Sequence, residues 1–156
     1  MHSLVLFLWF TVCAAQDLRQ RQIANTLTLG AAALALLYLV WTDSTWLGAS
    51  AEQGGWAFFL ALLLTLPGYA SGRLGAGDVK LLAALALASD SRYLLGSVIG
   101  AGVASVLWWG LAPRLWPLLD QGLRTQLRHL QVKASGKPAF APFLLVGLLA
   151  SALWIN

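Results

Sequence analysis

The sequence is poor in charge and almost without cysteine. Charged residues make up 10% of the chain, Cys13 is the single cysteine, and the two histidines, His2 and His129, lie far apart. One cysteine excludes an intrachain disulfide, and these residues match no metal-ligand spacing, so we expect no metal centre and no cofactor. Hydrophobic residues make up 59% of the 156 positions, more than soluble domains of this size carry. The composition therefore predicts a membrane protein with several spans.

Six apolar segments divide the chain. Several are shorter than the roughly 20 residues that a transmembrane helix needs, so we expect the helices to extend into the polar residues on either side. This extension places Asp17 and Asp78 near membrane depth. The prediction is one all-α domain over residues 1–156 with six transmembrane helices. The apolar segments are residues 3–16, 27–41, 56–70, 79–89, 94–112 and 139–155.

The positive charges fall mainly in alternate loops. Nine of the ten lysines and arginines lie in the first, third and fifth loops, and Arg92 alone lies in the fourth. By the positive-inside rule these odd loops are cytoplasmic and both termini face outward. The first segment has no basic residue before it, which favours a retained helix over a cleaved signal peptide. Because the loop pattern accounts for the net charge of +4, we expect no nucleic-acid partner.

The fifth loop carries leucines at helical spacing among basic residues. This pattern predicts an amphipathic helix that lies on the cytoplasmic leaflet and contacts membrane lipid. The alternative is a helix that grips a substrate. The leucines are Leu119, Leu123, Leu127 and Leu130, and the cations are Arg124, Arg128 and Lys133.

Small residues recur every four positions in the fifth apolar segment, at Gly96, Gly100 and Ala104. Such spacing lets a neighbouring helix approach closely. We therefore expect these residues to pack against another helix rather than to form part of an active site.

Two of the six acidic residues lie where chemistry is plausible. Asp17 and Asp78 each stand where a short apolar segment meets a cytoplasmic loop, so both reach the same face of the membrane. Two neighbouring carboxylates cannot both ionise cheaply and therefore share a proton. One then activates a water and the other donates to a carbonyl oxygen, which is the chemistry of an aspartic protease. The others are expected in solvent: Asp43, Glu52, Asp90 and Asp120.

The string GAGDVKLL precedes and begins the fourth apolar segment. Gly75 and Gly77 allow unusual backbone dihedrals or the close approach of an extended substrate chain. The alternative is a turn in which Asp78 is the N-cap of a helix. Lys80 follows Asp78 by two positions, so on a helix we expect it to point away and to meet phosphates or a loop carbonyl.

Three stretches together resemble the type IV prepilin peptidases, which are membrane aspartic proteases of the GxGD type. The resemblance implies that Asp17 and Asp78 are catalytic and that Gly75 and Gly77 are the motif glycines. In length and layout the chain is most similar to the short Flp/Tad branch, which lacks the methyltransferase region. The implied substrate is a prepilin or pseudopilin, whose short basic leader is cut after a glycine at the cytoplasmic face of the bacterial inner membrane. The stretches are GAGDVKLL, QDLRQRQIANTLTLG and FAPFLLVGLLA.

The chain departs from that family's pattern at two positions, where Ala24 and Ala141 replace a proline and a glycine. Neither change removes an acid, a base or a water-positioning group. Asn25 is expected to orient a loop by bonding backbone groups, with substrate contact as the alternative.

Two other functions stay open from the sequence. Paired membrane carboxylates also relay protons, so a proton-coupled transporter is one alternative. The other is a non-catalytic partner in pilus or secretion assembly, in which the aspartates only cap helices.

Overall fold

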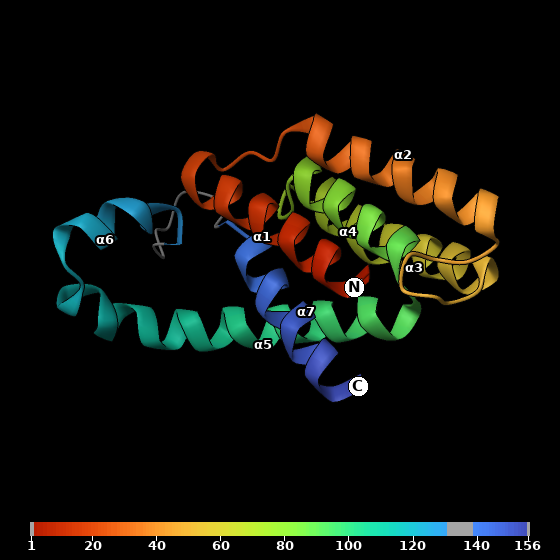
Figure 1. Cartoon of the computed structure of the whole chain (residues 1–156). Helices are drawn as coiled ribbons and strands as arrows, with labels where there is room; N and C mark the ends of the chain where they lie inside the picture. Colours follow the sequence, from red (N-terminus) through yellow and green to blue (C-terminus); the bar gives the residue numbers. More distant parts are fainter. Residues whose placement is uncertain (1, 131–138, 156) are drawn as a thin grey trace.

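The computed structural model describes residues 2–130 and 139–155, and the elements it forms there are helical (Figure 1). Each of the six predicted apolar segments is a helix. The first five helices extend beyond the apolar runs, as predicted, so Asp17 and Asp78 are both helical residues. The six helices are α1 (His2–Gln20), α2 (Asn25–Thr42), α3 (Ala51–Ala70), α4 (Ala76–Ala88), α5 (Ser91–Leu115) and α7 (Ala141–Ile155).

The short helix α4 lies at the centre of the bundle. Every residue from Leu81 to Ala88 is buried, which is the pattern of a helix that is apolar on all sides and surrounded by others. It packs mainly between α2 and α3, and it also contacts α5. Because neighbours hold α4 on several sides, its first turn, which carries Asp78, belongs to a rigid element.

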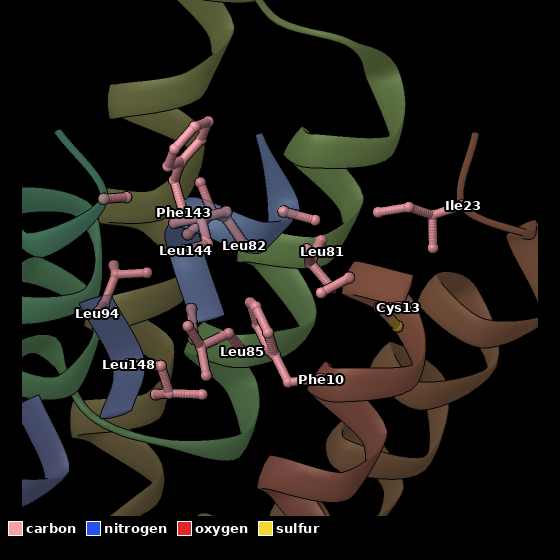
Figure 2. Close-up of a cluster of buried hydrophobic side chains, with 14 of the residues drawn as sticks. Phe10, Cys13, Ile23, Leu81, Leu82, Leu85, Leu94, Phe143, Leu144 and Leu148 are labelled. Atoms are coloured by element: carbon pink, nitrogen blue, oxygen red, sulfur yellow. The ribbon is translucent and has the colours of Figure 1, made fainter. Parts of the chain in front are cut away.

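The hydrophobic core joins α4 to the first and last helices. Phe10 of α1, Leu85 of α4, and Leu144 and Leu148 of α7 are fully buried and lie in one cluster (Figure 2). Helix α1 packs against α7, so the first and the last helix lie side by side. This packing brings the end of α1 that carries Asp17 to the beginning of α7.

Helices α5 and α7 cross in close contact through glycines. A Cβ atom added to Gly100 would lie 2.6 Å from the Cα atom of Gly147, and one added to Gly96 would meet the side chain of Ser151. This confirms the prediction that Gly96 and Gly100 admit a neighbouring helix. The neighbour is the C-terminal helix.

Two of the described helices are long and apolar enough to cross a membrane. They are Asn25–Thr42 and the continuous helical stretch Ser91–Leu118, which includes the 3₁₀ turn η1 (Trp116–Leu118). Helix α7 is a shorter apolar helix. The arrangement of six membrane spans stays a prediction.

The fifth loop does not form the single amphipathic helix that its leucine spacing predicts. It contains η1, the short helix α6 (Gln121–Gln126) and a second 3₁₀ turn, η2 (Arg128–Leu130). Leu130 is buried in the core and Leu127 packs against it, whereas Leu123 is exposed. The protein core therefore takes part of the apolar face that was predicted for lipid. Lys133 lies outside the described residues.

Candidate active site

Asp17 lies in the last turns of α1 and is buried, with 7% of its surface exposed. Its Oδ2 atom accepts a hydrogen bond of 3.0 Å from the backbone N–H of Ala141. Ala141 is the first residue of α7, where backbone N–H groups have no partner within the helix. The positive end of the α7 dipole also favours a negative charge at this position. The fold thus holds the buried carboxylate at a helix N-terminus.

Asp78 has a related position at the start of its own helix. It is the third residue of α4 and is half-buried, and its Oδ2 atom accepts a hydrogen bond of 3.2 Å from the backbone N–H of Gly75. The N-cap of α4 is Gly75, so the alternative in which Asp78 is the N-cap is wrong. The carboxylate instead reaches back to the cap residue, as an acidic residue in the first turn does in a capping box.

The two motif glycines act through space and not through unusual dihedrals. Gly75 has φ −81° and ψ 154°, an extended conformation open to other residues, and Gly77 lies within the helix. A Cβ atom on Gly75 would lie 3.3 Å from Oδ2 of Asp78, a tight contact, whereas one on Gly77 would lie 3.8 Å from Cβ of Ile23. Of the two roles predicted for these glycines, unusual dihedrals are therefore wrong, and the close approach of a substrate chain stays a prediction. Gly75 leaves room for the Asp78 carboxylate.

A single polar cavity of about 540 Å³ contains both aspartates in its lining. Its walls come from the end of α1, the loop to α2 and the first turns of α2 and α4. The structure thus brings together all six residues that the sequence singled out, Asp17 and Asp78 with both motif glycines, Lys80 and Asn25. The other lining residues are Gln16, Gln20, Arg21, Gln22, Ile23, Ala24 and Ala76.

Lys80 and Asn25 form a bridge across this cavity. The Nζ atom of Lys80 donates to Oδ1 of Asn25 at 2.8 Å, which ties the beginning of α2 to the beginning of α4. Lys80 was expected to point away from Asp78 and to meet phosphates or a loop carbonyl. Its ammonium instead bonds the side-chain amide of Asn25, in the lining of the cavity that also contains Asp78. Asn25 was expected to bond backbone groups, and its side-chain oxygen bonds this ammonium instead.

Gln16 is a cavity residue that the sequence did not reveal. Its Oε1 atom accepts a hydrogen bond of 2.9 Å from the backbone N–H of Ala24. A proline at position 24 has no N–H to give, so this bond depends on the departure from the family pattern noted above. The sequence shows Ala141 only as a departure from the family pattern. No sequence pattern predicts the hydrogen bond from its backbone N–H to Asp17.

The described residues contain no group of three or more histidine, cysteine, aspartate or glutamate side chains that could hold a metal ion. The polar groups of the cavity are carboxylates, amides and cations. These groups can bind and deprotonate water, and they can donate to an extended backbone.

The fold and the site define a helical bundle with two helices long and apolar enough to cross a membrane, and with two carboxylates in the lining of one polar cavity. Comparison with known proteins gives the family. Residues 4–110 match the model of the type IV leader peptidase family. Because the match covers more than half of the chain, the chain belongs to this family, which is membrane-associated and processes prepilins. No curated protein and no solved structure matched.

Proposed function

We propose that this protein is an aspartic endopeptidase that removes the short basic leader of Flp-type prepilins, with Asp17 and Asp78 as its catalytic pair. The observation that carries the proposal is that these two aspartates, from α1 and α4, line one polar cavity. They lie 61 positions apart in the sequence, and the family match includes both. Pseudopilins that share the leader and the apolar helix are substrates of the same kind.

The reaction needs only the two carboxyl groups and a water. One ionised carboxylate takes a proton from the water, whose oxygen attacks the carbonyl carbon of the scissile bond. The other carboxyl group is protonated and donates its proton to the carbonyl oxygen, which gives a tetrahedral intermediate. Collapse of this intermediate breaks the C–N bond, and the amine leaves with a proton from the carboxyl group that had accepted one. One hydroxyl of the intermediate returns its proton to the other carboxylate, which restores both groups and leaves the new carboxyl end of the leader. No metal or cofactor takes part in this scheme.

The other cavity residues have supporting roles in this proposal. Gly75 and Gly77 have no side chains and so leave space beside Asp78, through which an extended leader can approach. The hydrogen bond between Lys80 and Asn25 holds the beginnings of α2 and α4 together beside the carboxylates. Lys80 and Asn25 are thus positioning residues.

The proposed membrane arrangement follows from the loops. The single domain 1–156 has six membrane spans, both termini outside and the cavity on the cytoplasmic side of the bacterial inner membrane. Support comes from the lysines and arginines that gather in alternate loops, and from Arg21 and Lys80, which lie in the lining of the cavity itself. The exposed apolar faces of α2 and α5 contact lipid in this arrangement.

The proposal is tested by co-expressing a Flp-type prepilin with the wild-type protein, Asp17→Asn or Asp78→Asn. Each variant is expected to insert normally and to lose processing, because an amide neither accepts nor donates the proton. Asp43→Asn is the matched control, since Asp43 is exposed and lies outside the cavity. Mature pilin at the wild-type level in both cavity variants would reject the assignment.

One observation favours a second candidate, a non-catalytic partner in pilus assembly. Both carboxylates accept backbone N–H groups at helix starts, as capping residues do. If capping is their whole role, the variant Asp17→Asn/Asp78→Asn still supports pilus assembly in a strain without the wild-type gene, and the prepilin is still cut. Accumulation of uncut prepilin in that strain favours the peptidase.

A further inference from the structure

A second cavity, of about 220 Å³, lies along the same three helices that line the polar one. Its walls include Leu6 and Trp9 of α1, Ala31, Leu34 and Ala35 of α2, and Ala84 of α4, with Trp46 from the loop after α2. All these side chains are apolar or aromatic. We refer to it as the apolar pocket.

The two cavities follow one another along the helices. On α4, Lys80 lines the polar cavity and Ala84 the apolar pocket, four positions or about 6 Å further along the helix. On α2, Asn25 lines the polar cavity and Ala31 the apolar pocket, six positions or about 9 Å further along the helix. The apolar pocket therefore begins one to two turns beyond the polar cavity and continues away from the two aspartates.

The space exists because α1 stands apart from α2. Within the described residues, helix α1 packs against α7, whereas α2 packs against α4. Helices α1 and α2 are therefore opposite walls of the apolar pocket (Figure 1). One hydrogen bond of 3.0 Å crosses between these walls, from Nε1 of Trp9 to the backbone oxygen of Leu27. The alanines on α2 and α4 have small side chains, which lets another helix come close to these two helices.

We propose that the apolar pocket is the docking site for the apolar helix of a membrane-inserted prepilin. This inference rests on the proposed function. A leader substrate has its cleavage site immediately before an apolar helix, so a chain whose cleavage site is beside Asp17 and Asp78 must place its first helical turns one to two turns further on. That is where the apolar pocket begins. Docking there fixes which peptide bond reaches the carboxylates.

The chemistry of the two cavities matches the two parts of such a substrate. The polar cavity offers carboxylates, amides and the cations of Arg21 and Lys80 to the leader and to the scissile peptide, and the apolar pocket offers apolar contact. Burial of apolar surface stabilises a complex when that surface leaves water, but a substrate helix that is already in lipid gains mainly packing. Docking in the apolar pocket thus determines the position and the orientation of the substrate helix more than it strengthens binding.

A photo-crosslinking experiment tests the occupant directly. Leu34 and Leu37 of α2 are similarly exposed, at 70% and 67%, but only Leu34 lines the apolar pocket. A benzophenone side chain is placed at either position in Asp78→Asn protein, which retains the uncut prepilin, in membranes. We expect crosslinks to the prepilin helix from position 34 at several times the yield from position 37. Crosslinks from position 34 to lipid alone would overturn the proposal.

A kinetic experiment separates docking from the chemistry of the cavity. Ala35→Leu adds bulk in the apolar pocket, and Ala33→Leu adds the same bulk at an exposed position of α2 outside it. Each variant is assayed with a membrane-inserted prepilin and with a short soluble peptide that contains only the leader and the cleavage site. We expect Ala35→Leu to raise KM for the prepilin about tenfold while the peptide is cut at the wild-type rate, and Ala33→Leu to change neither.

The outcomes of the kinetic experiment are distinguishable. Equal kinetics of Ala35→Leu and Ala33→Leu on the prepilin would reject docking and leave the proposed function intact. An equal loss on both substrates would also reject docking, because the cavity itself would then be disturbed. If the wild-type protein cuts neither substrate, the proposed function fails.

Discussion

The carboxylate of Asp17 accepts a hydrogen bond from the backbone N–H of Ala141, a residue 124 positions further along the chain. This bond fastens the C-terminal helix α7 to the first helix at the candidate active site. The family match ends at residue 110, before α7 begins. The contact therefore extends the candidate site to a part of the chain outside that match, and it gives Asp17 a structural role beside its proposed chemical one.

Two substitutions distinguish the structural role of Asp17 from its proposed chemical role. Asp17→Asn keeps an oxygen that can accept from Ala141 but cannot exchange a proton, whereas Asp17→Ala leaves a buried N–H without its acceptor. We expect both to abolish leader cleavage, and only Asp17→Ala to lower the free energy of unfolding, by about 1–3 kcal/mol. Unfolding in detergent micelles measures the difference. Equal stability of the two variants would show that the bond contributes nothing measurable.

The bridge between Lys80 and Asn25 predicts a coupling between the two positions. Lys80→Met and Asn25→Ala each remove the hydrogen bond, so the double variant should lose little more than either single one. We expect a coupling of about 0.5–1.5 kcal/mol in kcat/KM for prepilin cleavage. Asn25→Asp keeps an acceptor for the ammonium and should retain more activity than Asn25→Ala. Additive losses in the double variant would mean that the bridge has no role in catalysis.

The contact of α5 with α7 predicts opposite effects of the same substitution at two glycines. A Cβ atom on Gly147 would meet the backbone of Ser97 and would lie 2.7 Å from the backbone nitrogen of Ala101, so the helices must move apart. We expect Gly147→Ala to destabilise the protein by about 1–3 kcal/mol, as overpacking does. Gly102 of α5 has nothing within 4 Å of an added Cβ atom.

Gly102→Ala is therefore the matched control for this contact. Alanine loses less backbone freedom on folding than glycine, so we expect Gly102→Ala to stabilise the helix by about 0.5–1 kcal/mol. Thermal unfolding in detergent compares the two variants. A Gly147→Ala protein as stable as wild type would show that the two helices adjust freely at this crossing.

The sequence predicted the helices better than the details of the site. Apolar runs determine where helices form, because each must bury or expose a mainly apolar surface, and all six were found. That Asp17 and Asp78 would reach the same side of the bundle followed from the loop charges, because those charges order the helix ends by side, and both residues line one cavity. Contacts made by backbone atoms or by long side chains leave no such pattern. The bond of Asp17 to Ala141 and the turn of Lys80 toward Asn25 depend on packing that only the folded chain defines.

The loop after α5 shows the same limit. Leucines at helical spacing predicted one amphipathic helix, but α6 ends at Gln126 and a 3₁₀ turn follows. Trp108 of α5 donates to the backbone oxygen of Leu130 at 2.7 Å, which draws this turn toward the bundle. Helical spacing alone does not distinguish a leucine that faces lipid from one that packs on the protein.

The departure at position 24 gives the last prediction. Ala24 has φ −57° and ψ 136°, which a proline can adopt, but its N–H donates to Gln16. In Ala24→Pro the stiffer unfolded chain contributes about 0.4–1 kcal/mol of stability, and loss of the hydrogen bond costs a similar amount. We expect no net change in the free energy of unfolding beyond about 0.5 kcal/mol.

The test of this balance is to repeat the substitution in a Gln16→Ala protein. There the hydrogen bond is already absent, so Ala24→Pro should stabilise by about 0.4–1 kcal/mol. Unfolding of the four proteins in detergent completes the cycle. If the proline has the same effect in both backgrounds, the bond between Gln16 and Ala24 is not what offsets it. If the cycle shows the expected coupling, Gln16 is the residue that makes an alanine as good as a proline in the loop between Asp17 and Asn25.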